Sequence, residues 1–128
     1  MRTVCYLRVE RSGETDVKEI DSILDPLSLE HRRREHDGSP IQSIPLEYWV
    51  TRRFESESEV APGFVDDVML AAVALRDSGL VGKISITAVV ARYFAEGEAP
   101  AGLYLNRTLL AALAEIDADV DIDAVPMI

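Results

Sequence analysis

Strand-like and helix-like segments alternate along this chain of 128 residues, and their order constrains the fold more than any other feature of the sequence. Alternating apolar and polar side chains predict strands over residues 3–9, 46–54, 83–93 and 119–125, and residues 27–35 are expected to form a further strand, exposed because of its basic run. Apolar residues at helical spacing predict a helix ending at Leu24, a helix over residues 64–77, and a helix from its cap Asn106 to Ile116. The order is therefore β-α-β twice and then α-β. It predicts an α+β fold, a mainly antiparallel sheet with helices on one face and ferredoxin-like β-α-β units.

The same periodicities predict which side chains face the core. Cys5 lies on the inward-facing set of the first strand, so we expect a buried and unreactive thiol. Trp49 alternates with Tyr48, and of the two we place Trp49 in the core. The predicted buried stripe of the second helix consists of Val65, Val68, Met69, Ala72 and Leu75 or Arg76.

Size and charge restrict the class of protein. The length predicts a single compact domain over residues 1–128. The net charge is −10, and it is concentrated in residues 55–128, which carry four basic and thirteen acidic side chains. An acidic surface repels phosphates, which argues against nucleic acid and against anionic membranes as partners. A single cysteine, no signal-peptide pattern and no apolar stretch of membrane-spanning length predict a cytoplasmic protein.

Four aspartates near the C-terminus alternate with other residues. In a strand, all four would point to one side about 7 Å apart. The four are Asp117, Asp119, Asp121 and Asp123. They do not form an EF-hand, because the turn glycine and the bidentate glutamate are missing. Two interpretations stay open: a stripe that binds basic side chains of a partner, or a solvated strand face neutralised by Lys83, Arg2 or Arg8. Repulsion between two such carboxylates is only about 0.6 kcal/mol in water, so the fold tolerates the stripe without any function.

Three glutamates form a second acidic group, in the connection that follows the third predicted strand. They are Glu55, Glu57 and Glu59. Such runs are commonly solvated loops. If this one lies near the aspartate stripe, the two groups would form one acidic field that speeds encounter with a basic partner.

The remaining polar residues predict no catalytic, cofactor or metal site. His31 and His36 are five apart, so in a strand their rings point to opposite faces, and the chain supplies no third soft ligand beside them. The basic run of residues 32–34 is flanked by Glu30, Glu35 and Asp37 and is therefore interpreted as self-neutralised surface. The chain has no nucleophile elbow, no phosphate-binding glycine loop and no zinc-protease motif.

Several segments in succession resemble a known family. They are an opening strand with Tyr6-Leu7-Arg8-Val9-Glu10 and its acidic helix, Trp49 in a short strand before an acidic loop, a long helix ending Arg76-Asp77-Ser78-Gly79, and residues 102–116 followed by the aspartate-rich strand. Together they cover nearly the whole chain and resemble a bacterial domain of unknown function, DUF4279. The resemblance implies no activity and no catalytic residues. By analogy with small acidic bacterial families that include immunity proteins, it suggests a protein that neutralises a toxin.

These features together predict a small acidic protein-binding module and not an enzyme. In its most specific form, it is an immunity protein that covers the active site of a basic toxin domain by charge-complementary contact. Two alternatives stay open. One is a homo-oligomeric structural domain, such as a homodimer, in which residues 27–35 or the last strand pair edge to edge. The other is an enzyme with an unrecognised carboxylate site, marked by a deep pocket that holds two close carboxylates.

Overall fold

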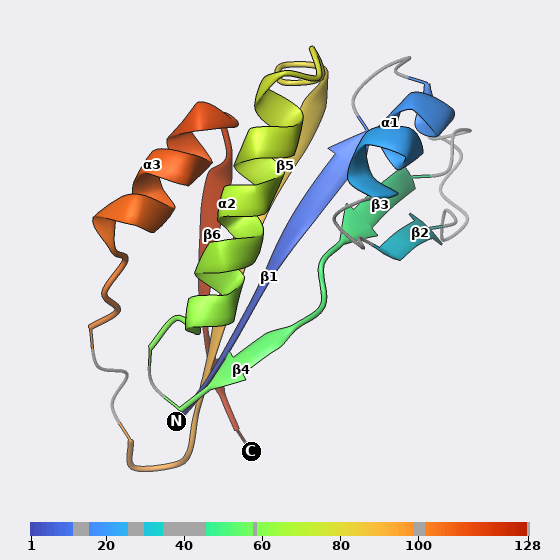
Figure 1. The fold of residues 1–128 in the computed structure, drawn as a ribbon. Helices are drawn as coiled ribbons and strands as arrows, with labels where there is room; N and C mark the ends of the chain where they lie inside the picture. Colours follow the sequence, from blue (N-terminus) through green and yellow to red (C-terminus); the bar gives the residue numbers. More distant parts are fainter. Residues whose placement is uncertain (12–15, 26–29, 35–45, 58, 99–101, 128) are drawn as a thin grey trace.

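The fold is an α+β arrangement of one open sheet with helices on one face (Figure 1). The structure is a computed structural model of the chain. It describes residues 1–11, 16–25, 30–34, 46–57, 59–98 and 102–127. The strands are β1 (Arg2–Arg11), β2 (Glu30–Arg34), β3 (Leu46–Val50), β4 (Phe54–Ser56), β5 (Ile84–Phe94) and β6 (Asp119–Pro126). The helices are α1 (Val17–Leu24), α2 (Pro62–Arg76) and α3 (Arg107–Glu115). Residues 37–40, whose sequence Asp-Gly-Ser-Pro predicts a turn, lie outside the described residues.

The strand order confirms the ferredoxin-like β-α-β units predicted from the sequence. The sheet runs β2-β3-β1-β5-β6, and β4 also pairs with β1. β1 and β2 are connected through α1, and β3 lies between them in the sheet. β3 and β5 are connected through α2, and β1 lies between them. These are the two β-α-β units of a ferredoxin-like core. All pairs in this core are antiparallel. The unit α3-β6 is added beyond it, and β6 pairs with β5 in parallel.

All three helices cover the same face of the sheet, with α2 between α1 and α3 (Figure 1). The core forms between α2 and the two central strands, where Leu7 of β1 pairs with Ala88 of β5 and both are fully buried. Trp49 joins this core as predicted, and its indole nitrogen donates a 2.6 Å hydrogen bond to Asp21 of α1. None of the helices in the described ranges is long and apolar enough to cross a membrane.

The sequence predicted one strand over residues 46–54, and this prediction was wrong at its end, because the segment is divided into β3 and β4. Val50 pairs with Arg8 and Phe54 pairs with Cys5, so three residues of this segment lie opposite two residues of β1. The extra residue makes a bulge, at which the Thr51 hydroxyl accepts a 2.9 Å hydrogen bond from the backbone N–H of Leu7. The predicted acidic connection consequently begins inside a strand, because Glu55 belongs to β4.

The buried stripe of α2 also differs from the prediction. Phe64, Val68, Ala71, Ala72 and Leu75 are buried, whereas Met69 is 43% exposed and Arg76 points to solvent. The helix is apolar on almost every side, so periodicity alone did not decide which residues face inward. The ring of Phe64 packs against Phe54 of β4 with 6.0 Å between ring centroids, and this contact anchors the start of the helix.

Candidate functional site

The helices leave one face of the sheet uncovered. Three of the four aspartates of the predicted stripe lie on this face, in the edge strand β6. Asp119, Asp121 and Asp123 are aligned with Thr87, Val89 and Ala91 of β5, on the face opposite the helices. All three are exposed. Their alternation in sequence is therefore an alternation in the structure, and three carboxylates project from one side of one strand.

Asp117 does not belong to this row. It lies in the turn between α3 and β6, where its φ of 52° places it in the left-handed region. Its backbone N–H bonds to the carbonyl of Ala114, and the N–H of Ala118 bonds to that of Leu113, which is the usual way in which a helix ends. The prediction that all four aspartates share one strand face was wrong for Asp117, because the chain turns at this residue before the strand begins.

The opposite face of β6 is apolar and also open. Val120 is 37% exposed and Ile122 is 50% exposed, although both point to the side of the sheet that carries the helices. This exposure was missed in the sequence, because alternation predicts that one set of a strand's side chains is buried. The signal that would have identified it is the position of β6 at a sheet edge, which only the strand order gives.

Two of the three basic residues expected to neutralise the aspartates, Arg8 and Arg2, do not pair with them. Arg8 is two strands away from Asp119, roughly 10 Å across the sheet, and its Nε lies 2.8 Å from a carboxylate oxygen of Glu10. The guanidinium of Arg2 stacks 4.7 Å from the ring centroid of Tyr93. Within the described part of the chain, no basic side chain lies within ion-pair distance of Asp119, Asp121 or Asp123.

The sequence around β6 strengthens this local charge. Residues 108–128 contain no lysine, arginine or histidine and have five acidic side chains, which is half of the net charge of −10. Four of the five lie in the turn and strand from Asp117 to Asp123, and the fifth is Glu115 at the end of α3. The turn and strand at this edge of the sheet thus carry acidic residues with no basic residue among them in the sequence.

The second acidic group is spread over a different part of the molecule. Glu55 shares the uncovered face with the stripe, but it is three strands from Asp123, roughly 14 Å across the sheet. Glu57 and Glu59 follow the end of β4 and are exposed. Glu59 lies with Asp66 and Tyr104 at a hollow of about 300 Å³ near the starts of α2 and α3.

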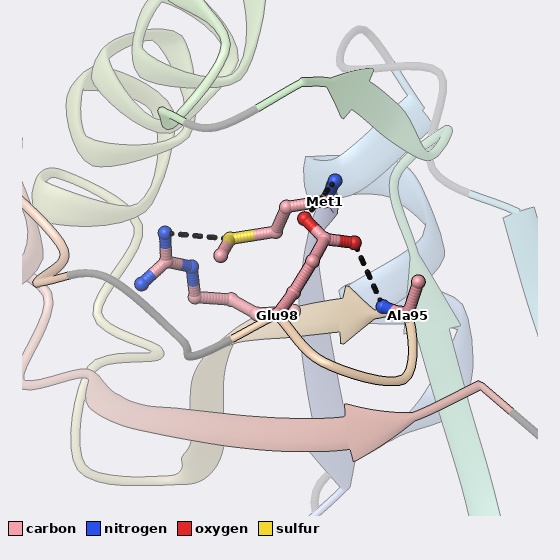
Figure 2. Close-up of polar contacts among 4 residues, drawn as sticks. Met1, Ala95 and Glu98 are labelled. Atoms are coloured by element: carbon pink, nitrogen blue, oxygen red, sulfur yellow. Dashed lines mark hydrogen bonds and ion pairs between the residues drawn. The ribbon is translucent and has the colours of Figure 1, made fainter.

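An ordered polar contact closes the turn after β5 (Figure 2). The carboxylate of Glu98 accepts a 2.9 Å hydrogen bond from the N–H of Ala95 and pairs with the Met1 amine at 3.1 Å. These contacts lower the pKa of Glu98, and the bond to Ala95 contributes most. The guanidinium of Arg92 lies 3.0 Å from the sulfur of Met1. The cluster joins the start of β1 to the end of β5 and includes no residue of β6.

A shallow apolar groove of about 430 Å³ separates α2 from α3. Met69, Val73 and Ala111 contribute apolar side chains to it, and Arg107 and Glu115 lie at its rim. This surface was not predicted from the sequence, because the helical periodicity placed Met69 in the core.

The other candidates for chemistry give no site among the residues that the structure describes. Cys5 is fully buried as predicted, and burial raises the pKa of its thiol to about 11. In these ranges no three histidine, cysteine or acidic side chains are grouped to hold a metal ion. His36 lies outside the described residues, as do the side chains of His31 and of residues 32–34.

Comparisons with known proteins find no match to this chain among family models, curated proteins or solved structures. The candidate site is therefore defined by its own geometry. It is an exposed edge strand with three carboxylates on one face, none of them in an ion pair with another described residue, and with exposed aliphatic side chains on the other face.

Proposed function

We propose that this protein binds a basic protein partner at β6. The observation that carries the proposal is the row of Asp119, Asp121 and Asp123, exposed on an edge strand with no cation in ion-pair distance among the described residues. A partner that presents lysine or arginine side chains would find three exposed carboxylates there, on one face of one strand. Such a field increases the rate of encounter and selects against acidic competitors.

A second copy of the chain is a poor partner for this edge. Two β6 strands paired antiparallel about Asp121 would place Asp121 opposite its own copy and Asp119 opposite the copy's Asp123, and like charges directly opposite each other destabilise a sheet. A shift by one residue would place Asp121 opposite Val120 and would put the uncovered face of one copy beside the helix face of the other. The charge pattern therefore favours a different, basic protein.

In its most specific form, the proposed function is that of a cytoplasmic immunity protein. Many toxin domains that act on nucleic acids need a basic surface to bind phosphates. An acidic edge that covers such a surface would block the substrate without any chemistry. The concentration of half the net charge in residues 108–128 supports this form of the proposal.

The test is capture of partners from the protein's own host at low salt, with two triple variants of equal charge. In the first variant, Asp119, Asp121 and Asp123 are changed to asparagine. In the second, Glu55, Glu57 and Glu59 are changed to glutamine. We expect a basic protein to be held by the native chain and by the glutamine variant, and to be held at least roughly tenfold more weakly by the asparagine variant.

Two results would overturn the proposal. If the native chain elutes alone, there is no such partner. If both triple variants lose the partner equally, net charge and not the β6 edge holds it. Titration of salt gives an independent measurement, because affinity of the native chain should fall more steeply with salt than affinity of the asparagine variant.

A further inference from the structure

We infer that the partner adds a β-strand to β6, and that this strand alternates basic and apolar residues. The inference rests on the proposed function at the same edge and specifies how the partner is held. It follows from the backbone of β6 and from the two sets of side chains that flank it.

The hydrogen-bonding register shows which backbone groups of β6 are free. The N–H of Met127 donates a 2.8 Å bond to the carbonyl of Phe94, so the odd-numbered residues of β6 direct their backbone groups toward β5. The even-numbered residues Val120, Ile122 and Ala124 direct theirs away from the sheet. Among the described strands, none pairs with this outer side. Pro126, the next even-numbered residue, has no N–H, so the row of outward backbone donors ends before it.

An added strand would therefore meet three free N–H and three free C=O groups, in a row of five residues. This is the geometry of strand addition, in which backbone bonds give affinity and side chains at alternate positions give specificity. The edge has no bulge over residues 119–126 and pairs residue for residue with β5, so it is straight enough to act as a template.

The side chains of β6 specify the sequence of the added strand. On the uncovered face, the aspartates would lie beside every second residue of the partner, and those residues should be lysine or arginine. On the helix face, Val120 and Ile122 are 37% and 50% exposed, and an apolar residue at the intervening positions would cover them. A strand that alternates basic and apolar residues satisfies both faces at once, whereas an uninterrupted basic run leaves the aliphatic side chains in water.

The test uses four synthetic seven-residue peptides and measures binding by fluorescence anisotropy at low salt. The first alternates lysine and valine, beginning and ending with lysine. The second has the same composition with all lysines first. The third and fourth have the alternating sequence with N-methyl groups on the valine amides or on the lysine amides. N-methylation removes backbone donors from one edge of a strand and keeps charge and side chains.

We expect the alternating peptide to bind at least tenfold more tightly than the shuffled one. We also expect one N-methylated peptide to lose at least tenfold in affinity and the other to keep it, because only one edge of an added strand faces β6. Which of the two loses affinity reports whether the strand runs parallel or antiparallel.

The outcomes separate this inference from the proposed function. If both N-methylated peptides bind as tightly as the parent, strand addition is wrong and purely electrostatic binding at β6 stands. If no peptide binds while the host capture still yields a partner that depends on the three aspartates, strand addition is again wrong and the proposed function survives. If the capture is empty as well, both fail. On the protein side, Ala124→Pro removes one outward N–H and should weaken the alternating peptide while leaving the melting temperature within a few degrees.

Discussion

Single residues show where a local pattern determines structure and where it does not. The period of two over residues 119–123 predicted a shared face for three aspartates, and the structure has them on one face of β6. The same pattern failed at Asp117, because a left-handed turn depends on how α3 ends and not on alternation. Cys5 was predicted correctly because the strand around it alternates cleanly and continues through the middle of the sheet.

The buried thiol gives a test at this scale. Cys5 should not react with a thiol reagent at pH 8 in the folded protein, because burial raises its pKa from 9.0 to about 11 and leaves almost no thiolate. Its modification should occur only at the rate of unfolding. Rapid labelling of the native protein would show that β1 is accessible.

The same pKa predicts a dependence of stability on pH. The unfolded thiol ionises first, so the contribution of Cys5 is constant below pH 9 and is lost as the pH rises from 9 toward 11, by at most about 3 kcal/mol. Lysine and tyrosine side chains titrate in the same range. The comparison is therefore between the native chain and Cys5→Ala, and urea unfolding should show a smaller loss of stability for the variant over this interval.

At the scale of elements, the sequence predicted the existence of each helix more reliably than its orientation. The α3 cap at Asn106 was predicted correctly, and its side chain accepts a 2.7 Å bond from the N–H of Leu109. The side of α2 that faces the core was not predicted correctly, because a helix with apolar residues on nearly all sides has no clear polar face. The bulge at Thr51 could not be predicted either, since it depends on the register with a strand more than forty residues earlier.

The orientation of α2 leads to a prediction with an internal control. Val68 is fully buried and Val73 is 57% exposed on the same helix. Val68→Ala should lower the free energy of unfolding by about 2 kcal/mol, because it removes two buried methyl groups and leaves a cavity. Val73→Ala should change it by less than about 0.5 kcal/mol. Urea denaturation measures both, and equal effects would mean that the helix is rotated from the orientation described.

At the scale of the whole molecule, the α+β class and most of the strands were predicted from the sequence, but the site could be located only from the strand order. Alternation showed that residues 119–125 form a strand. Only the order β2-β3-β1-β5-β6 places that strand at an edge, with both faces open and one row of backbone groups free. The acidic stripe was thus visible in the sequence, whereas the exposed Val120 and Ile122 beside it were not.

The charge of the molecule predicts how its stability responds to salt. Repulsion among carboxylates about 7 Å apart on β6 is roughly 0.6 kcal/mol for each neighbouring pair in water and is screened by salt. The melting temperature should therefore rise between low salt and about 0.5 M sodium chloride. The triple asparagine variant should start higher at low salt and rise less, whereas a lower melting temperature would mean that the aspartates stabilise the edge.

The pairing of β1 has a consequence for the synthesis of the protein. β1 is near the start of the chain and is the strand on which the core sheet is built, yet Leu7 pairs with Ala88, which is made 81 positions later. Ribosomes add about 5–20 residues per second, so this partner follows after about 4–16 s. β3 and β4 are made earlier and pair with one edge of β1. A pause in translation between β4 and β5 would therefore prolong the time during which the other edge of the nascent β1 can pair with a strand of another chain.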